Sequence, residues 1–110
     1  MSELTVMRGY VYSSLGTDLD LGELVELFVS EIPARVAKLE EAWDSRDWDS
    51  LGRAAHQLKG AAGSYGFEEL TPSLRKLDHS VRMEKPEEEI DEALAEAREL
   101  CSRVRASGPE

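Results

Sequence analysis

The sequence predicts an all-α fold, an antiparallel four-helix bundle, and three observations favour it. Apolar residues recur at helical intervals of three and four positions through most of the chain. No stretch keeps the strict alternation of polar and apolar residues that is typical of strands. Short polar or proline-containing turns separate four amphipathic segments, and short connections favour antiparallel neighbours. We therefore expect an up-down-up-down bundle over residues 19–106, preceded by a short N-terminal extension.

The first predicted helix begins near Asp20, because Asp20 and Glu23 have the spacing of a capping box. Its apolar face continues beyond Pro33, so we expect the proline to kink the helix and not to end it. The residues of this face are Leu21, Leu24, Val25, Phe28, Ile32, Val36, Leu39 and Trp43.

The second predicted helix follows a polar turn at residues 44–47, with Asp47 as its N-cap. A narrow apolar seam runs along it, and Gly66 follows where a helix end favours a residue with positive φ. The seam consists of Leu51, Ala55, Leu58, Ala62 and Tyr65.

The third helix is expected to become regular at Thr71, after a looser turn, and the fourth to begin at Pro86. Acidic residues 87–89 lie in the first turn of the fourth helix, and we expect Arg103 and Arg105 in its last turn, as the helix dipole prefers. The apolar residues of these two helices are Phe67, Leu70, Leu74, Leu77 and Val81, then Ile90, Leu94, Ala97, Cys101 and Val104.

The two ends of the chain are less regular. Residues 1–18 could pack as a short helix or as an irregular strap, and residues 107–110 are expected to form a disordered tail. No apolar run approaches the roughly 20 residues that cross a bilayer, and the N-terminus has no signal-peptide pattern. The single cysteine excludes an internal disulfide and fits a reducing compartment. We expect one cytoplasmic domain, monomeric and without a membrane segment.

The charge of the chain is uneven. A formal net charge of −10 argues against a nucleic-acid partner, because phosphate backbones select for basic surfaces. Residues 46–85, in contrast, hold seven basic and six acidic side chains and carry a net charge of +1. Such a patch is where an anionic ligand or an acidic partner would bind, although charge alone does not exclude chance fluctuation.

One histidine has a distinctive helical setting. His56 lies one residue, or about 100°, away from the apolar seam of its helix, so its ring is expected to face solvent. Lys59, Gly60 and Gly63 follow at intervals that place them on the same outward face. Each glycine inside a helix costs about 0.5–1 kcal/mol relative to alanine, which suggests that something approaches the backbone there. The alternative is that another helix of the same protein packs on this face.

These residues resemble a known family. The run His56-x-Leu58-Lys59-Gly60, followed by Gly66, is similar to the signature of histidine phosphotransfer (HPt) domains. The resemblance covers about residues 19–106 and implies a phosphocarrier of a two-component phosphorelay. Its histidine, here His56, would accept a phosphoryl group from a receiver-domain aspartate of a response regulator and pass it to another. Further similar features are residues 24–28 with the following proline, Asp47 with Trp48, and Leu77-Asp78 with Arg82.

The resemblance also implies roles for single residues. Lys59 would supply positive charge to the phosphoryl oxygens, and Arg82 would add a further basic group. Asp78 stands where some relatives have glutamine, which puts hydrogen-bond support from that position in question. No cofactor of its own is expected, since Mg²⁺ would be held by the acidic pocket of the receiver. The residues expected to contact the partner are Arg53, Gln57, Gly60 and Gly63.

Several alternatives remain open at this point. Gln57 follows the histidine where dimeric kinases carry an acid, and no glycine-rich nucleotide motif is present, so we expect no ATP-dependent kinase activity. The chain could be standalone, or a module excised from a hybrid sensor kinase. It could also be an inactive dimeric kinase fragment, or a non-phosphorylated four-helix adaptor that binds a partner helix or a receiver. His79 is expected at the surface, and Cys101 in the core.

Overall fold

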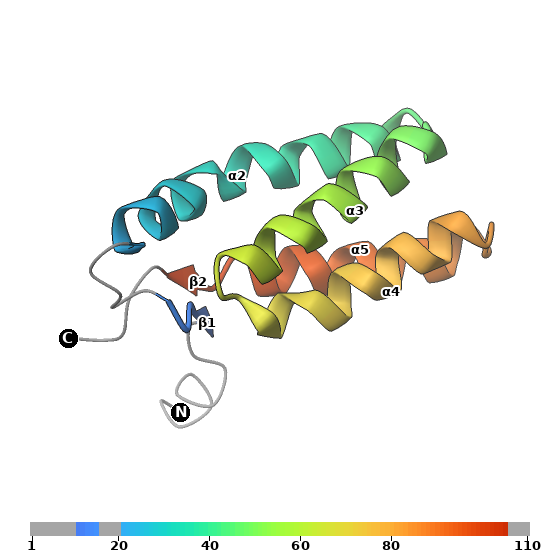
Figure 1. The fold of residues 1–110 in the computed structure, drawn as a ribbon. Helices are drawn as coiled ribbons and strands as arrows, with labels where there is room; N and C mark the ends of the chain where they lie inside the picture. The colour runs from blue at the N-terminus through green and yellow to red at the C-terminus, as the bar shows by residue number, and fades with distance from the viewer. Residues whose placement is uncertain (1–10, 16–20, 106–110) are drawn as a thin grey trace, which may run out of the picture.

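The computed structural model describes residues 11–15 and 21–105, and in these ranges four helices run alongside one another with alternating directions (Figure 1). The predicted all-α four-helix bundle is confirmed. The helices are α2 (Gly22–Asp44), α3 (Trp48–Ser64), α4 (Thr71–Arg82) and α5 (Glu87–Cys101). A short 3₁₀ turn, η1 (Glu68–Leu70), precedes α4, and two-residue strands, β1 (Val11–Tyr12) and β2 (Val104–Arg105), flank the helices in the chain.

Helix α2 is one continuous helix through Pro33, and its N-cap is Leu21. Its N-cap is one residue later than the capping-box spacing predicted, and Asp20 lies outside the described residues. Its buried face includes the side chains of Val25, Phe28 and Ile32.

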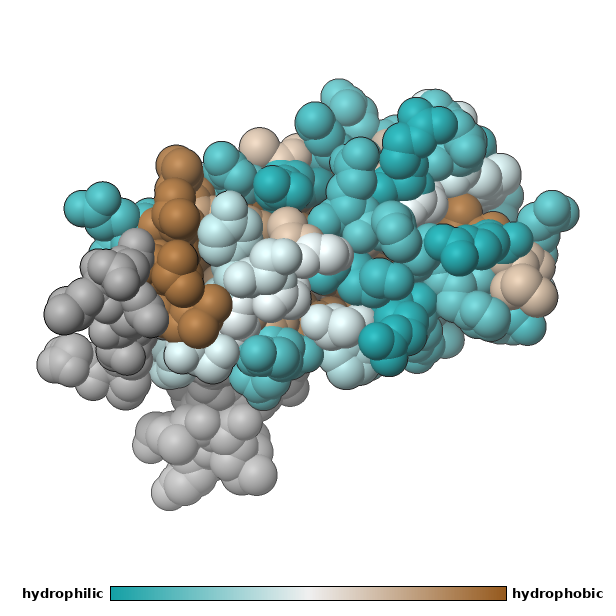
Figure 2. Space-filling model, viewed as in Figure 1, coloured by the Kyte–Doolittle hydropathy of each residue, from teal (hydrophilic) through white to brown (hydrophobic). Residues whose placement is uncertain are grey.

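The predicted apolar face of this helix is not buried at its first two residues, Leu21 and Leu24. Leu24 is 47% exposed and Leu21 is 36% exposed. Leu24 lies at the edge of the apolar face, and the first turns of α2 extend past the end of α3 in Figure 1. Leu27 is also exposed, and Figure 2 shows hydrophobic surface gathered at this end of the molecule.

Helix α3 begins as predicted, because Asp47 caps it. One Asp47 carboxylate oxygen accepts a hydrogen bond from the Ser50 backbone N–H at 3.1 Å, and the other accepts one from the Ser50 hydroxyl at 2.8 Å. These bonds, the hydroxyl one first, hold the pKa of Asp47 below its ordinary value. The predicted seam is buried at Leu51, Ala55, Leu58 and Ala62, and Tyr65 is partly buried. The core therefore lies between α3 and the other three helices.

Gly66 ends this part of the chain with a φ of +85°, as predicted. A Cβ atom at this position would lie 2.6 Å from the Ser13 hydroxyl oxygen and 3.0 Å from Leu15. Conformation and space therefore both require glycine here.

Helix α4 begins at Thr71 after η1, as the Thr-Pro pair predicted. Helix α5 ends at Cys101, so the prediction that Arg103 and Arg105 lie in its last turn was wrong. Arg105 belongs to β2, which pairs in parallel with β1, and the Arg103 carbonyl accepts a hydrogen bond from the Val11 N–H at 2.7 Å. After the helix, the backbone of residues 103–105 pairs with this strand, which the sequence analysis did not predict.

The described part of the N-terminal extension is the strand and turn at residues 11–15. Val11 is buried in the core, the Ser13 hydroxyl donates to the Tyr65 carbonyl at 2.5 Å, and the Ser14 N–H donates to the Gly66 carbonyl at 2.9 Å. This segment is thereby fastened to the end of α3. The rest of residues 1–18 and the expected tail at residues 107–110 fall outside the described residues. In the parts of the chain that the structure describes, no helix combines the length and apolar character needed to cross a membrane.

Candidate functional site

His56 lies in the middle of α3, on the outward side predicted from its spacing. Its side chain is 60% exposed, while the preceding residue, Ala55, is fully buried in the apolar seam. The ring is therefore presented to solvent from a helix whose apolar seam is buried in the core.

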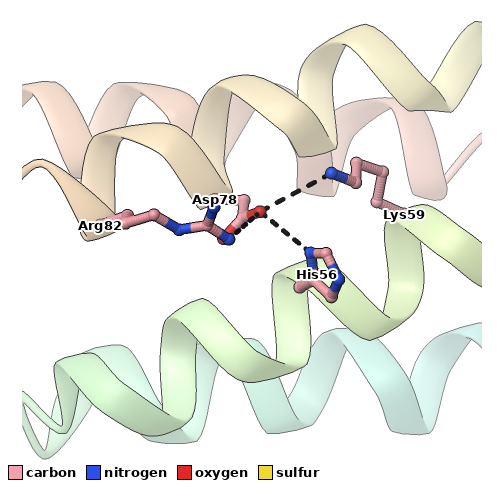
Figure 3. A network of polar contacts seen from close by, with 4 residues as sticks. All are labelled: His56, Lys59, Asp78 and Arg82. Atoms are coloured by element: carbon pink, nitrogen blue, oxygen red, sulfur yellow. Dashed lines mark hydrogen bonds and ion pairs between the residues drawn. The ribbon is translucent and has the colours of Figure 1, made fainter.

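A buried carboxylate from the neighbouring helix contacts the ring. Asp78 of α4 has a side chain only 7% exposed, and one of its oxygens lies 3.2 Å from Nδ1 of His56 (Figure 3). The same oxygen lies 3.7 Å from Nζ of Lys59 and 2.9 Å from a guanidinium nitrogen of Arg82. Asp78 thus joins the three residues for which the sequence predicted phosphoryl chemistry.

The helices bring these groups together for simple reasons. Asp78 follows the core residue Leu77, so its side chain lies at the edge of the buried face of α4, and Arg82 lies one turn further on. Gly52, one turn before His56, lets α3 approach α4 closely. A Cβ atom at Gly52 would lie 3.3 Å from Cγ1 of Val81, which is tighter than ordinary contact. This close approach sets the distance between His56 and Asp78.

The contact with Asp78 defines what the imidazole can do. A carboxylate accepts hydrogen bonds only, so a neutral His56 bonded to it carries its proton on Nδ1. Its Nε2 then has a free lone pair and lies on the side of the ring away from Asp78 (Figure 3). An exposed imidazole with a fixed tautomer and an outward Nε2 is equipped to act as a nucleophile.

The surface beside the ring is open. No described atom outside the local helix lies within 4 Å of a Cβ atom built on Gly60 or on Gly63. For the described residues this finding contradicts the alternative in which another helix of the same protein packs on this face. Arg53 and Gln57 are exposed on the same helix, and Arg53 forms an ion pair with Asp49.

A groove of about 690 Å³ lies on the other side of the ring, between α3 and α4. His56 and Asp78 line one part of it, and its walls carry both the basic side chains of Arg53, Arg82 and Lys85 and the acidic side chains of Asp49, Glu84 and Glu87. The groove therefore places side chains of both charges beside the imidazole.

The match to a family model agrees with the geometry. The model described as Hpt domain matches residues 23–107 of this chain. The chain belongs to the Hpt domain family. Hpt domains are phosphocarriers that take part in histidine phosphotransfer in phosphorelays and interact with receiver domains. No curated protein and no solved structure matches the chain.

The residue of this Hpt domain that sequence reasoning undervalued is Asp78. Its position directly after Leu77 and four residues before Arg82 indicates a carboxylate at the edge of the core. Such a carboxylate requires hydrogen-bond or ion-pair partners. His79 is exposed, as predicted, and has no part in the cluster around Asp78. Cys101 is buried, as predicted, and burial raises the pKa of its thiol to about 11.

Proposed function

We propose that Nε2 of His56 accepts a phosphoryl group from the phosphoaspartate of one receiver domain and passes it to the aspartate of a second. The single observation that carries this proposal is the exposed imidazole held at Nδ1 by the buried carboxylate of Asp78. Membership of the Hpt domain family supports it, because it makes a histidine the carrier of the group.

The transfer is a displacement at phosphorus. The Nε2 lone pair attacks in line, the P–N bond forms, and the P–O bond to the receiver's aspartate breaks so that a carboxylate leaves. The product is a phosphoramidate, which reacts in the same way with the next aspartate. Phosphoryl transfer depends mainly on positioning and charge neutralisation. Lys59 and Arg82 provide that charge from this chain, and Mg²⁺ is held by the receiver.

The receiver docks over the open face of α3. Gly60 and Gly63 leave room for its surface to reach the ring, and Gln57 and Arg53 flank the same path. A larger side chain at either glycine position would stand between the His56 ring and the receiver's aspartate. Small residues therefore suit this face.

A labelling experiment with matched histidine variants tests the proposal. A receiver phosphorylated with ³²P is incubated with wild type, His56→Gln and His79→Gln, and the label on each protein is counted after separation. Wild type and His79→Gln should carry label that is lost in acid and stable in base. His56→Gln should melt like wild type and carry none. Label on His56→Gln would refute the assignment, and no label on any protein would favour an adaptor that only binds the receiver.

A further inference from the structure

We infer that Asp78 keeps the proton on Nδ1 of His56 after Nε2 has been phosphorylated. The phosphohistidine is then short-lived, and its phosphoryl group is readily donated. This inference rests on the proposed function and concerns the lifetime and the direction of transfer. It comes from the contact between the buried carboxylate of Asp78 and Nδ1 of His56.

The charges around the ring favour this state. At rest, the Asp78 carboxylate faces Lys59 and His56 from α3 and Arg82 from α4, so with a neutral ring the cluster carries a formal charge of +1. The transferred PO₃⁻ unit adds a charge of −1. The cluster then becomes neutral with the Nδ1 proton in place, and no proton has to enter or leave.

Phosphorylation also gives the cations Lys59 and Arg82 a second anionic group to pair with, besides Asp78. The phosphoryl group carries two negative charges on the Nε2 side of the ring and attracts Lys59, which lies 3.7 Å from Asp78, and the 64% exposed side chain of Arg82. The phosphorylated ring with a proton on Nδ1 is a cation. The buried Asp78 oxygen, 3.2 Å from Nδ1, is the described group that pairs with it directly. If Nδ1 lost its proton, its lone pair would instead face a carboxylate, which repels it.

The Nδ1 proton decides how readily the P–N bond breaks. When Nδ1 carries a proton, the departing ring takes the bonding electron pair on Nε2 and leaves as neutral imidazole. Without that proton the ring would have to leave as an imidazolate anion, which is a much poorer leaving group. A neutral amide at position 78 could turn its NH₂ toward the bare Nδ1 and stabilise the unreactive form.

The test compares wild type with Asp78→Asn, which has the same shape and lacks the charge. Asp91→Asn, an exposed aspartate of α5, controls for the loss of one charge. Each protein is phosphorylated by a labelled receiver, separated from it, and followed for loss of label between pH 6 and pH 9. At pH 8 the label on Asp78→Asn should last about tenfold longer, the effect of one hydrogen bond to a charged group. Asp91→Asn should behave like wild type.

The outcomes separate this inference from the proposed function. No label on any protein would refute the proposed function itself. Label that decays equally fast on wild type and Asp78→Asn, at every pH, would refute the role of Asp78 alone. Should Asp78→Asn not fold, the ring ¹⁵N spectrum of phosphorylated wild type at pH 8 decides. A protonated Nδ1 supports the inference, and a bare Nδ1 overturns it.

Discussion

Replacing Gly60 or Gly63 by glutamine should make the protein melt higher and transfer more slowly. Both glycines lie within α3, and a Cβ atom at either position meets nothing within 4 Å among the described residues. Removing the backbone freedom of a helical glycine should therefore stabilise the fold by about 0.5–1 kcal/mol. For a chain of this size that corresponds to a rise in melting temperature of roughly 2–6 °C.

The same substitution should damage the transfer step. Gly60 lies one turn from His56, about 6 Å along the helix axis. A glutamine side chain there stands between the ring and the surface of a docked receiver. Because a displacement of about 1 Å at the reacting atoms can reduce the rate a hundredfold, we expect at least that loss in single-turnover transfer.

Gly52→Gln is the matched control, since it is the same change in the same helix. There the new side chain would press against Val81, only 3.3 Å from the Cβ position, so this variant should melt lower than wild type. Thermal unfolding and single-turnover transfer are measured on all three variants. If Gly60→Gln melts lower, or melts higher and transfers at the wild-type rate, the open docking face proposed here is wrong.

Two further substitutions and one chemical modification test other features of the protein. Lys59→Ala should slow single-turnover transfer at saturating receiver by about tenfold, with little change in the receiver's Kd. An unchanged rate with much weaker binding would contradict the role of Lys59 at the phosphoryl group. Asp47→Ala should lower the melting temperature by removing the cap of α3. Because the pKa of Asp47 is lowered by folding, its contribution is complete above its ordinary pKa of 3.8 and is lost as the pH falls through the lowered value. The difference from wild type should therefore shrink in melting curves recorded below pH 3.8, and a constant difference would speak against the cap. Cys101, with a pKa of about 11, should react slowly with iodoacetamide at pH 8 until denaturant exposes it, and fast reaction in the folded protein would mean that the thiol is not buried.

The sequence predicted the parts of the fold that depend on local periodicity. The seam of α3, the cap at Asp47, the turn at Gly66 and the start of α4 each follow from a few neighbouring residues, and each was found in place. The predictions were wrong where burial or secondary structure depends on contacts with distant parts of the chain. Leu24 has helical spacing suited to burial, yet it is 47% exposed beside the fully buried Val25, because burial depends on where the rest of the chain packs against α2.

In the site, too, local features could be predicted and contacts between helices could not. The outward position of His56 and the open glycines follow from helix geometry and could be predicted. The contact between His56 and Asp78 could not, because it depends on how closely α3 and α4 pack, and Gly52 and Val81 set that distance from one turn away. Spacing within one helix carries no information about which residue of another helix lies opposite.

The pairing of β1 with β2 has a consequence for the order of folding. It joins residues 11–12 to residues 104–105, almost the whole described chain apart, through a ladder of only two residues on each side. So short a ladder is too weak to offset the entropy of closing such a long loop, whereas the helices and the contacts between successive helices are local. The ladder therefore forms after the bundle has brought its two sides together. Slowed hydrogen exchange at the Val11 amide, which donates to the Arg103 carbonyl, would then report that folding has gone to completion.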